Sequence, residues 1–316
     1  MKFSNISLII INKKGLGIGN IKRSFYLSQL LKKKFNIYPI LIGNNNNDSF
    51  NPFKKKLLKL EKIDFNYIIK YLNDNNIKKV IIDYYHFPKK FLVRLKKDDI
   101  KTIKISDFNE KNDSKTYDLI LNQYISKKEN YKNLNFIIIN PQINKYINLT
   151  KDKKITIFFG FESNLKKIQN FIKAMERINQ LKSYKKTLIL YGKYSKKKII
   201  LTEYKCLNIE RNPFNYFKII SRSLLAFGEA GTAAIERDIF KIFSLNFITT
   251  NNQINTPSIL KNSNYAFFNN SSFKNSIKFF EKEIVNFLKK INLNRKNLNN
   301  LKSFNNNNII NLIKKV

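Results

Sequence analysis

Short runs of consecutive apolar residues alternate along the chain with longer stretches in which apolar residues recur at helical spacing. The first run, Ile6–Ile11, precedes residues Ile21–Lys34, where Leu27, Leu30 and Leu31 share one helix face. Strands that are apolar throughout are typical of parallel sheets covered by helices on both faces. The pattern therefore predicts an α/β protein built from repeated β-α-β units.

The expected elements fall into two series, separated by residues 140–154, which contain Pro141 and lack a clear period. The first series has strands at Ile6–Ile11, Ile37–Ile42, Lys79–Asp83, Thr102–Ile105, Leu119–Leu121 and Phe136–Ile139, with helices at Ile21–Lys34, Leu57–Leu72 and Lys89–Lys97. The second has strands at Ile155–Phe159, Thr187–Tyr191, Cys206–Ile209, Leu224–Phe227, Ile242–Ile248 and Ala266–Phe268, with helices at Leu165–Leu181, Pro213–Ser221, Thr232–Phe240 and Ser272–Ile291. We predict two doubly wound, Rossmann-like domains, residues 1–145 and 152–292, and a low-complexity or helical tail, residues 293–316.

Composition narrows the class of protein. Hydrophobic residues make up 43% of the 316, enough for two cores, and no apolar run approaches the roughly 20 residues that span a bilayer. The single cysteine, Cys206, excludes an internal disulfide, and the single histidine, His86, excludes a two-histidine metal site. We expect a cytoplasmic protein without metal, cofactor or membrane span, and nothing in the sequence predicts its oligomeric state.

The formal net charge of +38 at first suggests a polyanionic partner. Only seven of the 60 basic residues are arginine, however, and the lysines are spread among many asparagines and isoleucines. Specific base recognition favours arginine, whereas this mixture is typical of a coding bias toward AT-rich codons. We therefore expect no specific nucleic-acid partner, although the overall field favours anionic small molecules.

All eight glycines follow predicted strands, and two clusters of them precede predicted helices. Gly15, Gly17 and Gly19 form the first cluster, and Gly228 and Gly231 the second. In doubly wound sheets, ligands bind at the carboxyl ends of the strands, and a helix N-terminus offers free amides to an anion. Both clusters are candidate phosphate or sugar loops; the alternative is ordinary turn chemistry.

The first cluster matches neither of two common nucleotide-binding motifs. A dinucleotide fingerprint would need glycine at position 20 or 22, where Asn20 and Lys22 stand, and no Gly-Lys-Ser/Thr follows as in a P-loop. Nicotinamide enzymes and P-loop ATPases are therefore disfavoured.

The second cluster carries the clearer chemistry. Gly231 and Thr232 would open a helix, and Glu236 would lie one turn further on the same face, where it could accept hydrogen bonds from ribose hydroxyls. Alternatively, Glu236 pairs with a lysine on a solvated face. Glu229 would repel a phosphate unless its side chain points away.

Several motifs in order resemble those of the bacterial hydrolases that remove UDP from a diacetamido-trideoxy-altropyranose in pseudaminic acid biosynthesis. The similar stretches are residues 17–23, 80–85, 105–108, 117–123, 231–237 and 252–253. The resemblance implies a GT-B-like fold, related to MurG-type glycosyltransferases, with a cleft between two Rossmann-like domains.

By this resemblance, residues from both domains bind the UDP-sugar substrate. The second domain would hold UDP through Gly231, Thr232 and Glu236. The loop of the first domain would contact the substrate through Gly17, Gly19 and Arg23, while Tyr85, Asn252 and Gln253 would line the sugar pocket.

The sequence departs from the family at the catalytic position. The family's histidine in the first loop, expected to activate water, is Asn20 here, and an amide is not a base near neutral pH. His86, beside Tyr85 after the third strand, is the alternative imidazole, unless its role is structural. Ser106 also replaces an acid of the family, and Gly160-Phe161-Glu162-Ser163 stands where the family has Gly-Gly-x-Asp.

Three functions remain open. The first is a UDP-sugar hydrolase of nonulosonic acid or surface-glycan synthesis, which cleaves at the anomeric carbon and releases UDP. The second is a GT-B glycosyltransferase, in which an acceptor hydroxyl replaces water. The third is a protein that has lost catalysis and only binds a UDP-sugar or, through its charge, a polyanion.

Overall fold

The computed structural model divides into two compact units, residues 1–141 with 305–316, and residues 142–304. The structure describes residues 4–11, 19–43, 53, 57–84, 87–106, 116–122, 138–160, 164–191, 207–269, 272–294 and 307–316. Each unit is built around one parallel sheet of six strands, as the apolar runs predict.

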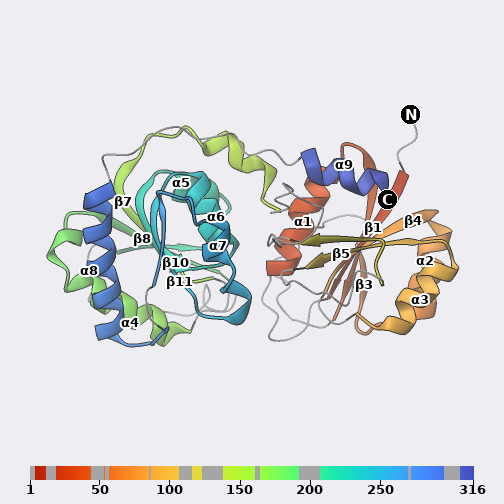
Figure 1. Cartoon of the computed structure of the whole chain (residues 1–316), viewed down its shortest axis with the longest axis horizontal. Coiled ribbons are helices and arrows are strands. Elements are labelled where there is room, and N and C mark those ends of the chain that lie inside the picture. The colour runs from red at the N-terminus through yellow and green to blue at the C-terminus, as the bar shows by residue number, and fades with distance from the viewer. Residues whose placement is uncertain are drawn as a thin grey trace. The chain divides into compact units, whose positions relative to one another are not determined.

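The first unit has the sheet order β3-β2-β1-β4-β5-β6. Its strands are β1 Ser4–Ile11, β2 Phe35–Ile42, β3 Leu58–Leu60, β4 Ile77–Asp83, β5 Lys101–Ser106 and β6 Leu119–Asn122. Its helices are α1 Gly19–Leu31, α2 Phe65–Asp74, α3 Lys89–Lys97 and α9 Asn307–Lys315. Figure 1 shows α1 on one side of this sheet and α2 and α3 on the other, which explains why its central strands are apolar throughout.

The second unit has the sheet order β12-β11-β10-β7-β8-β9. Its strands are β7 Asp152–Phe158, β8 Lys185–Leu190, β9 Leu207–Arg211, β10 Ser223–Glu229, β11 Phe243–Phe247 and β12 Ala266–Phe268. Its helices are α4 Leu165–Glu176, α5 Tyr216–Ser221, α6 Thr232–Ile239, α7 Thr256–Ile259 and α8 Ile277–Asn294, with 3-10 turns η1 Pro141–Tyr146, η2 Asn179–Leu181 and η4 Asn251–Gln253. Figure 1 shows α4 and α8 on one side of the sheet and α5, α6 and α7 on the other.

Phenylalanine dominates the core between this second sheet and helices α4 and α8. Phe171 of α4 packs on Phe227 of β10, with ring centroids 5.3 Å apart, and on Phe280 of α8 at the same distance. Phe247 of β11 contacts Phe280 edge-on. These rings bury a large apolar area. They pack strands β10 and β11 firmly against α4 and α8.

Both sheets have the same topology, which determines where a ligand is expected. Counted within each unit, the strand order is 3-2-1-4-5-6, the order of the Rossmann fold. The order reverses between β1 and β4 in the first unit and between β7 and β10 in the second. The carboxyl ends of these strand pairs are the switch points at which doubly wound sheets bind ligands.

The structure corrects two predicted elements. The expected helix Leu57–Leu72 is instead the edge strand β3 followed by α2, because Leu58–Leu60 pairs with β2 and Asp64 accepts from the backbone N–H of Tyr67 to cap the helix. Of the expected strand Phe136–Ile139, only Ile138 and Ile139 are described, and neither is in a strand.

Helix α9, in the predicted tail, belongs to the first unit. Ile309 and Ile313 are buried, and the Lys79 ammonium donates to the carbonyls of Ile313 and Lys314 at 3.0 and 3.2 Å. These carbonyls lie in the last turn of the helix, where a cation is favourable.

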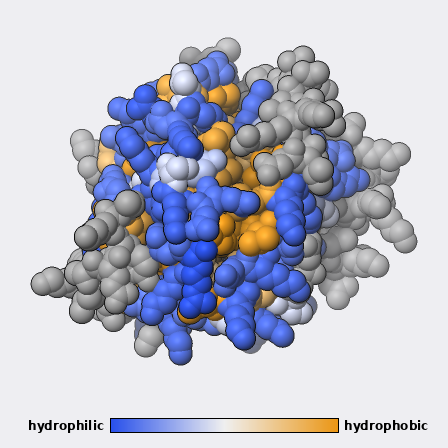
Figure 2. Space-filling model, turned by 90° about the vertical axis from the view of Figure 1, so that its left-hand side faces the viewer, coloured by the Kyte–Doolittle hydropathy of each residue, from blue (hydrophilic) through white to orange (hydrophobic). Residues whose placement is uncertain are grey.

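The described surface is mostly hydrophilic on one face of the molecule. On the face that Figure 2 shows, hydrophilic residues cover most of the described surface and surround a smaller apolar area. Among the described residues, no helix combines the length and apolar character that crossing a membrane requires.

Candidate functional site

The switch point of the second sheet is held together by close backbone contact. Gly228 of β10 lies opposite Phe158 of β7, and a Cβ on Gly228 would meet the Phe158 carbonyl oxygen at 2.0 Å. Gly160, directly beyond β7, has a φ of +81°, which favours glycine. The fold itself therefore requires glycine at position 228 and favours it at 160.

Gly231 differs from both. It is the N-cap of α6 with φ −90° and ψ −158°, a conformation open to any residue, and apart from its two chain neighbours no residue has an atom within 4 Å of a Cβ built there. No side chain caps the helix, and Thr232 is exposed at its first position. The Ala234 N–H donates to the Gly231 carbonyl at 2.9 Å, whereas the amides at the very start of a helix have no partner within it. This turn combines open space with free hydrogen-bond donors.

A buried arginine fixes the base of the turn. Arg237 of α6 donates through Nη2 to the Asn246 side chain at 2.6 Å and to the Glu229 carbonyl at 2.7 Å. Burial lowers the pKa of this guanidinium from its ordinary value. On the other side, the Thr256 hydroxyl donates to the Ala230 carbonyl at 2.6 Å. The turn between β10 and α6 is thus held at two points.

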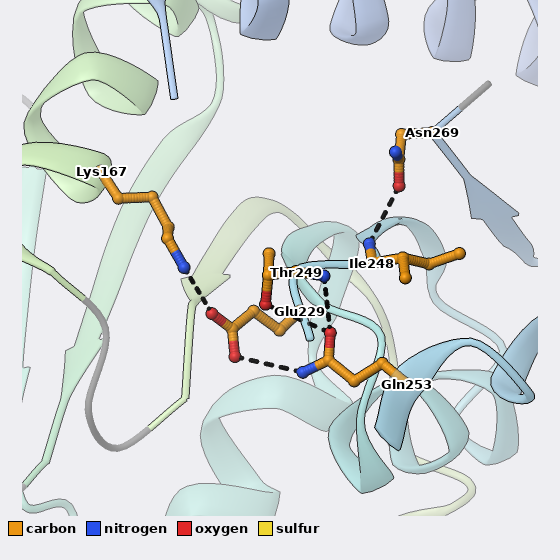
Figure 3. A network of polar contacts seen from close by, with 6 residues as sticks. All are labelled: Lys167, Glu229, Ile248, Thr249, Gln253 and Asn269. Carbon is orange, nitrogen blue, oxygen red and sulfur yellow. Dashed lines mark hydrogen bonds and ion pairs between the residues drawn. The ribbon is translucent and has the colours of Figure 1, made fainter. Parts of the chain in front are cut away.

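The Glu229 side chain points to α4 (Figure 3). Its Oε1 accepts from the Lys167 ammonium at 2.8 Å, and its Oε2 from the Gln253 amide at 3.4 Å. The Glu229 carboxylate is therefore paired with a cation.

Gln253 and Asn252, both predicted sugar-pocket residues, lie in η4, beyond β11. The Gln253 side chain is buried, and its Oε1 accepts from the backbone N–H and the hydroxyl of Thr249 at 2.9 and 3.2 Å. Figure 3 shows Gln253 linking Thr249 to Glu229. The structure describes the backbone of Asn252 but not its side chain.

Glu236 lies inside the unit. Its side chain is only 5% exposed, so it does not sit on a solvated face. Burial raises the pKa of the Tyr191 hydroxyl, and the charge of Glu236 raises it further. The Tyr191 hydroxyl donates to the Pro213 carbonyl at 3.0 Å. Glu236 therefore lies near the end of β8 and the segment after β9.

Phe214 follows Pro213 at the same edge of the sheet and is fully exposed. Sequence reasoning missed this residue, as it missed Lys167 and Thr256. An aromatic residue next to a proline beyond a strand was the only available signal for Phe214. Nothing in the sequence marked Lys167 among its neighbouring lysines.

Most predicted residues of the first unit lie outside the described residues or are only partly described. Gly17, Tyr85 and His86 are outside them; Gly19 and Asn20 begin α1, but the Asn20 side chain is not described.

Arg23 is the first-unit site residue that the structure describes best. Its Nε donates to Asp83 Oδ2 at 3.0 Å, its Nη2 pairs with Oδ1, and the Ser24 hydroxyl donates to Oδ2 at 3.2 Å. The ion pair is largely buried, with Asp83 3% exposed. It ties the start of α1 to the end of β4.

Metal binding was not expected. In the part of the chain that the structure describes, no group of three or more His, Cys, Asp or Glu side chains is arranged to hold a metal ion.

Comparison with known proteins establishes the fold. No family model matches the chain, and no curated protein matches its sequence. Among solved structures it is similar to MurG of Acinetobacter baumannii, with 10% identity, a TM-score of 0.66, and coverage of 99% of this chain and 100% of that one.

Two further structures cover nearly the whole chain. UDP-GlcNAc 2-epimerase from Neisseria meningitidis, bound to UDP-GlcNAc, has 9% identity, a TM-score of 0.62 and 98% coverage of both chains. Phytolacca americana UGT2, complexed with UDP-2fluoro-glucose and pterostilbene, has 10% identity, a TM-score of 0.62 and 100% coverage of both. The chain thus has the two-domain Rossmann-like GT-B fold.

Proposed function

We propose that this protein binds a UDP-sugar and cleaves it at the anomeric carbon with release of UDP, as the resembling hydrolases of pseudaminic acid biosynthesis do. The observation that carries the proposal is Gly231: a glycine that the backbone does not require, facing open space at a switch point. Glycine at such a position leaves room for a ligand to approach the backbone closely.

The proposed nucleotide site follows the strand ends of the second unit. The diphosphate would sit on the first-turn amides at Gly231 and Thr232, stabilised by the helix dipole. Glu236, one turn on, would accept from the ribose hydroxyls. Phe214 offers an exposed ring on which a base can stack, and the bond from Tyr191 to Pro213 links that segment to the neighbourhood of Glu236.

The remaining predicted residues would serve the sugar and the chemistry. Asn252 and Tyr85 would line the sugar pocket, and Gly17, Gly19 and Asn20 would contact the substrate from the first unit. Hydrolysis needs a group that takes a proton from water, and a positioned base contributes about 10²–10⁴-fold. His86 is our candidate for this base. Backbone amides and lysines can neutralise the charge that develops on UDP.

Transfer to an acceptor is the second candidate reaction. Asn20 stands where the resembling hydrolases have their water-activating histidine, and the similar structures include MurG. A transferase does not need to activate water at that position. Product analysis with a UDP-sugar, with and without a candidate acceptor, distinguishes free sugar from a transferred one.

Calorimetry with UDP tests the proposal. We expect wild-type protein to bind UDP and Gly231→Val to lose at least about tenfold in affinity, because a branched side chain would fill the space over the amides, while the melting temperature stays close to wild type. No binding at millimolar UDP would contradict the proposal. UDP binding without turnover would favour a protein that has lost catalysis, and steeply salt-dependent RNA binding without UDP binding would favour a polyanion binder.

A further inference from the structure

We infer that Lys167 enables the turn at Gly231 to accept a diphosphate, by neutralising the carboxylate of Glu229. The inference rests on the proposed function and assigns a positioning role to a residue outside the predicted site.

The need for such a residue follows from the sequence of the turn. Glu229 ends β10, two residues before the N-cap Gly231. A carboxylate near the helix N-terminus competes with an anionic ligand for the same positive potential. At an effective dielectric constant of about 20, two like charges roughly 8 Å apart repel enough to weaken binding by tenfold or more.

Two side chains hold the Glu229 carboxylate in its place, and a glycine leaves room for it. Lys167 reaches it from α4 at 2.8 Å, Gln253 from η4 at 3.4 Å, and Gly160 leaves room for it, since a Cβ there would lie 3.0 Å from Oε2. Figure 3 shows the carboxylate between the lysine and the amide.

An aromatic ring lies close to the Lys167 ammonium, and the ion pair is largely shielded from solvent. Its ammonium lies 5.3 Å from the centroid of the Phe273 ring, and the side chains of Lys167 and Glu229 are only 14% and 19% exposed. A partly buried pair is screened by salt much less than an exposed one. Lys167 therefore cancels the charge of Glu229 at short range, and the amides of the turn remain available to an anion.

If Lys167 acts by neutralising Glu229, the UDP affinities of three variants should follow an order that a purely structural role of Lys167 does not predict. Lys167→Met leaves the negative charge of Glu229 without its cation and weakens UDP binding by about ten- to a hundredfold. Glu229→Gln keeps the shape and an acceptor oxygen but frees the lysine, so binding tightens by about threefold or more. The double variant restores neutrality and binds within about threefold of wild type.

Calorimetry of the full-length protein with UDP, repeated with inorganic pyrophosphate and at two salt concentrations, measures this ranking. Lys166→Met is the matched control, because it removes the same charge from the adjacent, exposed position of α4; it should change affinity less than twofold. Thermal melts check that each variant is folded.

The outcomes separate the inference from the proposed function. Wild-type protein that binds neither probe contradicts the proposed function. If wild type binds UDP and both Lys167→Met and Glu229→Gln bind it with wild-type affinity, the proposed role of Lys167 is wrong. A double variant as weak as Lys167→Met overturns it too, since the lysine would then contact the phosphate directly or serve the fold. If Lys167→Met does not fold, Glu229→Gln alone decides: unchanged or weaker binding refutes the inference.

Discussion

An arginine is largely buried at each of the two switch points, but its surroundings differ between the two units. The last residue of β4 in register with β1 is Asp83, whose carboxylate binds Arg23. The corresponding last residue of β10 in register with β7 is Gly228, whose missing side chain leaves room for Arg237. In the first unit, the arginine forms an ion pair with a carboxylate. In the second, the arginine occupies the space beside a glycine and donates to uncharged oxygen atoms.

This difference affects what each edge can bind. In the first unit, the side chain at the strand end is committed to an ion pair with α1. In the second, the residue at the matching register position is a glycine, the arginine is hydrogen-bonded to a carbonyl and an amide oxygen, and the nearby turn at Gly231 has room for a side chain. Equal topology therefore places both edges alike, and the side chains at these two strand ends pack differently.

The largest expected effect concerns Gly228. Gly228→Ala would place a methyl group 2.0 Å from the Phe158 carbonyl oxygen and 3.0 Å from the Arg237 guanidinium. Because both obstacles are fixed, we expect a loss of more than about 4 kcal/mol in the free energy of unfolding, or no folded protein. Urea denaturation measures it.

Gly231→Ala is the control for that variant, and its expected cost is at most about 1 kcal/mol, since its Cβ meets nothing and alanine is only a poorer N-cap. Equal losses at both positions would contradict the distinction between a packed glycine and an open one.

A smaller effect is expected in the first unit. Asp83→Leu removes one member of a buried ion pair and leaves Arg23 without this carboxylate, at a cost of about 3–4 kcal/mol. Arg23→Met combined with Asp83→Leu should recover more than half of that loss, because two apolar side chains replace both charges. Thermal or urea unfolding of the three variants tests this; strictly additive losses would show that the pair is not coupled.

The smallest effect is a pH dependence at the opposite end of the second sheet. The Lys151 ammonium donates to the carbonyls of Ser221 and Phe240 at 2.5 and 2.6 Å, much as Lys79 does for α9 in the first unit. Burial, and then the charge of Lys241, lowers the pKa of Lys151 from 10.5 to about 8.

Between pH 8 and 10.5, unfolded Lys151 therefore keeps a proton that folded Lys151 has lost. Because the unfolded state binds more protons, this group makes the free energy of unfolding rise with pH in that window, by about 1–3 kcal/mol. We expect the rise to be smaller by this amount in Lys151→Met and unchanged in the exposed control Lys153→Met. Parallel pH profiles of wild type and Lys151→Met would refute this.

The sequence predicts the fold well because both units follow a strong local pattern. Helix α3 has the predicted bounds, and β12 does as well. The prediction failed at Leu58–Leu60, where pairing with β2 overrides a local pattern that suits a helix.

The candidate site is only partly predictable. Gly231, Thr232 and Glu236 follow from the order of strand, glycine and helix. Lys167 does not, since it lies far from Glu229 in the chain and resembles every other lysine around it.

The sequence by itself determined the class of fold, the order of the elements and the placement of glycines at the strand ends, because these depend on apolar period and on the backbone freedom of single residues. Only the tertiary structure decided which glycine is packed and which is open, and which charges cancel, because those properties depend on atoms brought together from distant parts of the chain. Gly228 and Gly231 are alike in the sequence, and they differ only through what surrounds them.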